Sequence, residues 1–377
     1  MKKTLVASAV AASLVTTPTM AADPEQQGAG DLFSQLSEQL EGMPEIYGNV
    51  QIIYTNADHE SFEGSQSQLT DYAYSTLGVQ HSHEIMPGVE AFGKLELEGF
   101  FVTEDTISEA IVVDEAYLGV RGGFGEVWVG SDDSQYEVLI GDYGNWYYEV
   151  AQSNFFSNWS TGEDDLVQYV SPSFGGLTLH GVVQIDAKNE RAVDNQDDQN
   201  NQSKYPYQLG VRYKMDRLSV ALAMDSNDGA ANNENTYGVR VDFAVNDSLS
   251  LNTFYSTQKG DRAVAAANEE FGADPVESFE SYGTVAENIG LGEDLIGVQG
   301  IYLMGATRFS LSYAMEEDDV DGAGDGKRES TNITAQVLHS LSEHLYVYVE
   351  GLRRNDEEGS AYDADYNAVN VGGAYLF

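Results

Sequence analysis

The chain has 377 residues, no cysteine, and 62 acidic residues against 18 Lys and Arg, which gives a formal net charge of −44 at pH 7. Without cysteine, neither a disulfide framework nor thiol chemistry is available. A chain this negative repels phosphate groups, so binding to DNA or RNA is excluded. Disorder is the usual alternative for a highly charged chain, but 23 Tyr, 15 Phe and 38 Gly with only 7 Pro favour many strands and turns.

Residues 1–22 have the features of a secretory signal peptide. Lys2 and Lys3 form a positive start, Leu5–Val15 is apolar, and Ala21 and Ala22 offer small residues for cleavage. The remaining 377 − 22 = 355 residues carry a net charge of 16 − 62 = −46. They contain no apolar run of the about 20 residues that a transmembrane helix needs. An exported chain of this kind is either soluble or a β-barrel, whose strands alternate between lipid and lumen.

Residues 23–45 form a separate N-terminal segment. Its apolar residues recur at helical spacing and are Leu32, Phe33, Leu36, Leu40 and Met43. This pattern predicts a short amphipathic helix over 31–42, which would lie in the periplasm, pair with other copies, or fold into a lumen. A flexible leader is the alternative.

From Ile46 to Phe377 the apolar residues follow a period of two. Val239 and Val241, for example, flank Arg240, so that one face is apolar and the other polar, as in a half-buried strand. The predicted strands are 46–57, 73–84, 88–102, 114–122, 125–132, 165–171, 177–186, 205–215, 217–225, 236–245, 248–257, 295–303, 306–314, 331–340, 343–352 and 367–377.

The connections between these sixteen segments alternate between seven tight turns and eight long loops. The long loops are 58–72, 103–113, 133–164, 187–204, 226–235, 258–294, 315–330 and 353–366. An even number of strands with every long loop at one end is the layout of an outer-membrane barrel. A soluble sandwich would carry a polar outward face and would not gather its long loops on one side.

The last predicted strand ends in an aromatic pattern. Val369, Val371, Gly373, Tyr375 and Phe377 lie on one face, and Phe377 is the final residue. Aromatic rings are favoured at the membrane interface, where Tyr375 and Phe377 would sit. We interpret these two residues as the signal that the bacterial barrel-assembly machinery reads.

Several segments in this order resemble the general bacterial porins, the 16-stranded trimeric family of Gram-negative outer membranes. They are Ile46–Val50, Asp114–Val120, Gly122–Gly130 and Gly372–Phe377. The resemblance covers 46–377 and implies an all-β, 16-stranded antiparallel transmembrane β-barrel with an inward-folded third loop. It implies a homotrimer surrounded by lipid and lipopolysaccharide, passive diffusion rather than catalysis, and no cofactor or metal.

The resemblance assigns the pore constriction to the third long loop, 133–164. Relatives tend to end the fifth strand with Gly-Arg-Gln, whereas this chain reads Gly130-Ser131-Asp132, so the usual arginine is absent. From Gly122 to Ala187 there is no Lys or Arg. Carboxylates around a narrow aqueous passage focus a negative potential and favour cations. The predicted constriction residues are Asp133, Glu137, Asp142 and Glu149.

Strand phase predicts charged side chains on the inner wall, because a charge facing lipid near the midplane costs about 2–4 kcal/mol. The predicted wall residues are Lys94, Glu96, Glu98, Arg121, Arg212, Arg240, Asp242 and Arg308. Opposite an acidic loop, the bases would set up a transverse field that orients polar solutes. Alternatively, each base pairs with a neighbouring carboxylate and stiffens the wall.

Two other patterns do not predict a metal site. An EF-hand loop that starts at Glu317 would have Arg328 at its twelfth position, where a glutamate is required. His81 and His83 share a strand face but lack a third ligand. We therefore expect a cation-preferring porin for small hydrophilic solutes. The alternatives are a substrate-specific channel, for example for sugars, and a barrel enzyme or adhesin.

Overall fold

The computed structural model describes residues 43–59, 65–70, 75–99, 112–141, 159, 161–185, 205–228, 235–258, 294–319, 327–356 and 366–377. The predicted signal peptide and the predicted helix at 31–42 lie outside these ranges. Within them, no helix has the length and apolar character needed to cross a membrane.

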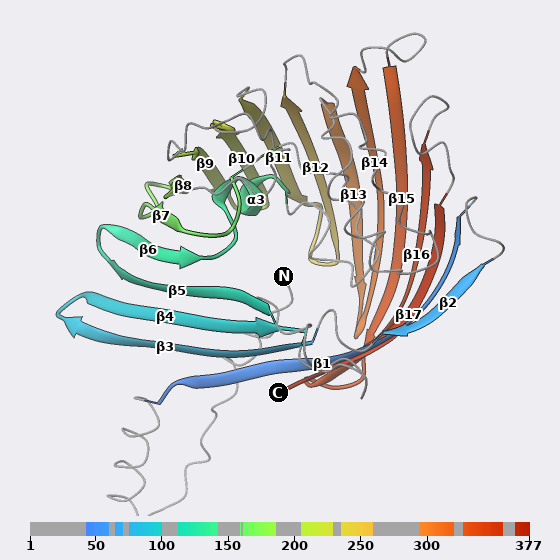
Figure 1. Cartoon of the computed structure of the whole chain (residues 1–377), viewed down its shortest axis with the longest axis horizontal. Helices are drawn as coiled ribbons and strands as arrows, with labels where there is room; N and C mark the ends of the chain where they lie inside the picture. Colours follow the sequence, from blue (N-terminus) through green and yellow to red (C-terminus); the bar gives the residue numbers. More distant parts are fainter. Residues whose placement is uncertain are drawn as a thin grey trace, which may run out of the picture.

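The described strands form one antiparallel sheet that closes on itself where β1 pairs with β17 (Figure 1). The strands are β1 (Glu45–His59), β2 (Gln66–Thr70), β3 (Thr76–Met86), β4 (Val89–Glu98), β5 (Val112–Gly122), β6 (Gly125–Ser131), β7 (Leu166–Val170), β8 (Leu177–Gln184), β9 (Tyr207–Met215), β10 (Leu218–Asp225), β11 (Thr236–Ala244), β12 (Leu249–Gln258), β13 (Asp294–Met304), β14 (Thr307–Asp319), β15 (Lys327–Ser340), β16 (Leu345–Asp356) and β17 (Tyr366–Leu376). Strands β2 and β3 pair with successive parts of β1, so they share one position in the barrel. The predicted 16-stranded barrel is confirmed.

The second barrel strand differs from the prediction because it is interrupted. The predicted strand 73–84 corresponds to β3, whereas β2 lies within the predicted loop 58–72 and pairs Leu69 with Tyr54. The segment Gln66–Thr70 contains one large apolar residue, Leu69, which is 66% exposed. A single apolar residue among polar ones does not show the alternation that identifies a strand.

The acidic tract after the predicted strand 306–314 also continues as strand rather than loop. The register of β14 and β15 sets Asp318 opposite Arg328 and Asp319 opposite Lys327. The hairpin therefore extends into the predicted loop 315–330, where the polar tract lacks the apolar alternation that identifies a strand from sequence.

The two faces of the sheet have the polarity of a membrane barrel. Large apolar residues such as Ile52, Leu118 and Val349 are 51%, 71% and 50% exposed, whereas Gln51 and Glu350 on the other face are each 1% exposed. A soluble protein would bury the apolar row instead. The outward apolar face therefore suits contact with lipid.

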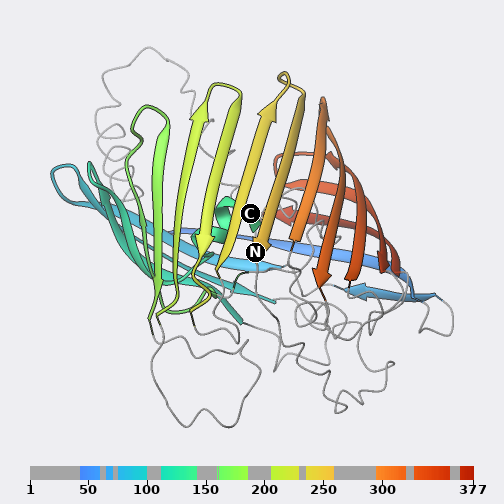
Figure 2. The same cartoon turned by 90° about the horizontal axis from the view of Figure 1, so that it is seen from above.

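The short turns lie at one end of the barrel. From β3 to β16, each of them joins an odd-numbered strand to the even-numbered strand that follows it, and all odd-numbered strands among these run in the same direction. Figure 2 shows the strands from green to orange side by side at a common tilt. Glycines in the left-handed backbone region allow these tight turns, as at Gly88 with φ 77° and Gly305 with φ 60°. The third long loop leaves β6 at the opposite end.

Candidate functional site

The third loop folds into the barrel and begins with a one-turn helix, α3 (Gln135–Leu139), against the inner side of β8, β9 and β10 (Figure 1). Tyr136, Leu139 and Ile140 are fully buried there. They form one apolar cluster with Ala221, Ala223, Phe254, Leu295 and Ala314 of the wall. The inward-folded third loop is therefore confirmed for its described residues.

Glycines on the wall make room for α3. A Cβ on Gly238 would lie 2.6 Å from the Tyr136 Oη and 2.7 Å from the Ile140 Cγ2, and a Cβ on Gly210 would overlap Leu139. Neither position tolerates a larger side chain while α3 stays in place.

Hydrogen bonds tie the same loop to the wall. The Tyr136 hydroxyl is 2.6 Å from the Ser256 hydroxyl. The Gln208 side chain accepts a bond of 2.7 Å from the Tyr136 backbone N–H and donates one of 2.9 Å to Asp225. Asp225 in turn accepts a bond of 3.1 Å from the Thr161 backbone N–H, so both ends of the loop are fixed.

Two of the predicted constriction residues lie together on this loop. Asp133, Glu137 and Glu163 each offer a carboxylate oxygen within 4.8 Å of the other two. The predicted residues Asp142 and Glu149 lie outside the described part of the chain. Negative charge therefore gathers on the described part of the loop.

Asp132 lies beside this group, just after β6. The Trp128 indole N–H donates a hydrogen bond of 2.7 Å to Asp132. Burial raises the pKa of Asp132 to about 7, and the nearby Glu115 carboxylate adds to the increase. The charge of this carboxylate therefore changes near neutral pH.

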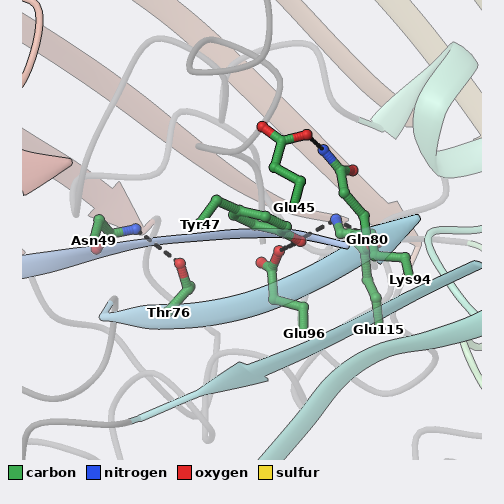
Figure 3. Close-up of polar contacts among 8 residues, drawn as sticks. All are labelled: Glu45, Tyr47, Asn49, Thr76, Gln80, Lys94, Glu96 and Glu115. Carbon is green, nitrogen blue, oxygen red and sulfur yellow. Dashed lines mark hydrogen bonds and ion pairs between the residues drawn. The ribbon is translucent and has the colours of Figure 1, made fainter. Parts of the chain in front are cut away.

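Strands β1, β4 and β5 carry a second charged group (Figure 3). The Lys94 Nζ lies 2.6 Å from the Glu115 carboxylate, 3.2 Å from the Glu96 carboxylate and 5.7 Å from the centre of the Tyr47 ring. The Tyr47 hydroxyl donates a hydrogen bond to Glu96. Asp114 joins Glu96 and Glu115 in one acidic cluster. Two carboxylates therefore contact a single ammonium and a third lies beside them. We call these four residues together with Tyr47 the Lys94 cluster.

Two of the predicted wall arginines form ion pairs, one with a predicted wall residue and one with a glutamate on the adjacent strand. The Arg240 Nε lies 2.9 Å from Asp242, and the Arg121 Nε lies 2.6 Å from Glu90. Glu98 is partly buried at the end of β4.

The other two wall arginines donate to neutral oxygens. Arg212 donates a hydrogen bond of 3.0 Å to the Val138 carbonyl oxygen of α3, and Arg308 donates one of 2.9 Å to the Gln336 side chain. Arg212 therefore lies beneath the loop rather than across the lumen from it.

Comparison with known proteins decides the family. The family model for Gram-negative porins matches residues 7–360. The chain belongs to the Gram-negative porin family. It is an outer-membrane porin, a passive channel and not an enzyme.

Relatives of this porin span its full length. A monosaccharide porin of a Halomonas species and the major outer membrane protein of Halomonas elongata are each 28% identical over 402 residues, which cover all of both chains.

Solved structures share the fold. The anion-selective porin from Comamonas acidovorans has a TM-score of 0.65 at 17% identity and covers 89% of this chain and 99% of its own. The trimer form of an outer membrane protein of Vibrio cholerae has a TM-score of 0.58 at 14% identity, with the same coverage.

The porin has a further pocket at the turn end of the barrel. It has a volume of 610 Å³, and its charged lining residues are Glu84, Glu90, Arg121 and Glu126. Glu90 and Glu126 are the register partners of Arg121 on its two sides. Carboxylates therefore outnumber the guanidinium here as well.

The C-terminal residues of the porin lie where the sequence places them, on the outward face near the turns. Tyr375 and Phe377 are 52% and 50% exposed. Their recognition by the assembly machinery stays a prediction.

Glu115 and Tyr47 are site residues that the sequence did not predict. The phase that assigns Arg121 to the inner wall also assigns Glu115, six residues earlier on β5, so this signal was available. Tyr47 gave no such signal, because its partner Glu96 is 49 residues away in the chain.

Proposed function

We propose that this porin conducts small hydrophilic solutes and ions and prefers cations. The observation that carries this proposal is the Lys94 cluster, in which the carboxylates of Glu96, Asp114 and Glu115 outnumber one base. Asp133, Glu137 and Glu163 of the third loop add a second group of carboxylates, and a low-dielectric wall strengthens the field of both groups.

The partners of the wall bases support the same preference. A carboxylate next to a base offsets the positive charge of that base and so weakens its attraction for an anion in the pore. Lys94, Arg121 and Arg240 each have a carboxylate within 3.2 Å. Arg212 and Arg308 already donate to protein oxygens.

The selectivity of the Comamonas acidovorans porin is no guide here. At 17% identity that likeness shows the fold alone. Selectivity depends on the charges that line the pore, which a shared barrel does not fix.

The test is the reversal potential of the purified porin in a planar bilayer with a KCl gradient. We expect cation preference, weakened by the double substitution Asp133→Asn and Glu137→Gln and strengthened by Lys94→Gln. Glu343→Gln, on an exposed turn, is the matched control and should leave the potential unchanged. Anion preference of the native protein would overturn the proposal.

A monosaccharide channel is the second candidate. One relative carries the name monosaccharide porin. The inner wall also bears Phe92 and Tyr117, whose rings meet edge to face at 6.2 Å between centroids, with Trp128 on the next strand. Aromatic faces suit the apolar faces of sugars. Concentration-dependent block of the ion current by glucose, reduced in Tyr117→Ala, would favour this candidate.

We also propose that three copies assemble, as the Vibrio cholerae relative does in its trimer form, with lipid and lipopolysaccharide around the outward apolar face. The mass of the detergent-solubilised protein, measured by light scattering, tests the trimer. The mass of the chain isolated from outer membranes tests the predicted removal of residues 1–22.

A further inference from the structure

His180 connects the barrel wall to the third loop. It lies on the inner face of β8 and is 9% exposed. Its Nδ1 is 2.6 Å from the Gln135 Oε1, and its Nε2 is 2.9 Å from the Thr178 Oγ1. Gln135 is the first residue of α3, so this contact joins a strand to the start of the loop helix.

The hydrogen bonds continue beyond Gln135 in one direction. The Gln135 Nε2 donates to the Gln168 Oε1 at 2.9 Å. The Gln168 Nε2 then donates to the Asp133 carbonyl oxygen, also at 2.9 Å. Because the Gln135 Oε1 can only accept, the His180 Nδ1 must carry the proton and donate. The chain of donors therefore runs from His180 through two buried amides to the backbone of Asp133.

We propose that His180 is a positioning residue that holds α3 in place and thereby fixes the passage through the pore. This inference rests on the proposed role of the third loop as the constriction. His180 acts through Gln135 and need not touch a permeating solute. Gln135 and Gln168 are 5% and 0% exposed, so water competes poorly for the bonds that hold them.

The geometry also explains why histidine suits this position. Its Nδ1 donates across to the loop while its Nε2 accepts from Thr178 on the same strand, which orients the ring. An asparagine places an amide N–H close to the position of Nδ1, whereas a leucine of similar size offers no donor. These two substitutions separate the hydrogen bond from the space that the side chain fills.

Single-channel recording of the full-length porin tests the inference. In His180→Leu we expect about a tenfold rise in the rate of transient current closures, the size that loss of one buried hydrogen bond gives. His180→Asn should restore the native rate. The control is His339→Asn, because His339 is an exposed histidine near the turn end of β15. This variant should keep the native closure rate.

Thermal unfolding followed by circular dichroism shows whether each variant keeps its barrel. If His180→Leu does not fold, the closure rates of His180→Asn and His180→Ser are compared instead. Asparagine keeps a donor for Gln135, whereas serine is too short to reach it. Native closure rates in folded His180→Leu or His180→Ser, or a failure of His180→Asn to restore them, would overturn the inference. The reversal potential is a separate readout, so failure of the cation preference would leave this result intact.

Discussion

Phe377 closes the barrel against Gly48. The backbone N–H of each residue donates to the carbonyl oxygen of the other at 3.0 Å. A Cβ on Gly48 would lie 2.8 Å from the Phe377 ring and 2.5 Å from the Thr76 carbonyl oxygen. The absence of a side chain at Gly48 therefore lets the terminal ring lie over the seam between β1 and β17.

Gly48→Ala should destabilise this seam. The added methyl group meets a backbone oxygen on one side and a ring on the other, and overpacking of this kind costs about 1–3 kcal/mol in the free energy of unfolding. The measurement is the temperature at which the barrel unfolds in detergent, followed by circular dichroism. Gly351→Ala is the control, since a Cβ there has nothing within 4 Å. An equal unfolding temperature for both variants would contradict the role of Gly48.

Gly238→Val should displace α3 toward the lumen. The new side chain would occupy the space of the Tyr136 hydroxyl and the Ile140 side chain, both fully buried. We expect lower single-channel conductance at a nearly unchanged unfolding temperature, because the barrel strands themselves are not crowded. Gly181→Val, where a Cβ has open space, should conduct as the native porin does. Unchanged conductance in Gly238→Val would show that α3 does not narrow the pore.

Strand phase made the barrel predictable from sequence, because each strand must face lipid on one side and water on the other. Leu118 and Arg121 illustrate this: they differ in phase, and the structure exposes Leu118 outward and pairs Arg121 with Glu90. Local alternation was enough for such residues, since it requires no knowledge of which strands are neighbours.

The docking of the third loop was not predictable in the same way. The apolar wall residues that the loop packs against are Ala221, Phe254, Leu295 and Ala314, from four strands. In the sequence, each is a single small or apolar residue at an inward position. The bond from His180 to Gln135 spans 45 residues of sequence. Contacts of this kind depend on how the loop enters the barrel, which no periodicity records.

The hydroxyls of Tyr136 and Ser256 should act as one unit in holding the loop. Tyr136→Phe and Ser256→Ala each remove the bond of 2.6 Å between them, and each should weaken docking by about 0.5–1.5 kcal/mol. Their effects on the closure rate should not add in the double variant, because both remove one shared interaction. Tyr136→Ala should have the larger effect, since it also empties a buried site. Strict additivity of the two small substitutions would argue against the shared bond.

The cation preference should depend on pH through Asp132. Its pKa in the folded protein is about 7, above the value of 3.8 for an unperturbed carboxyl group. The folded state therefore holds the Asp132 proton more tightly than the unfolded state does. The stability that this proton contributes falls as pH rises from about 4 and is fully lost above about 7. The same ionisation adds negative charge beside the constriction, so cation preference should rise between about pH 5 and about pH 9 with a midpoint near 7. Reversal potentials across this range provide the measurement. Asp132→Asn should remove the step near pH 7, whereas Asp247→Asn, on a fully exposed turn, should retain it. A step that persists in Asp132→Asn would assign the titration to another group.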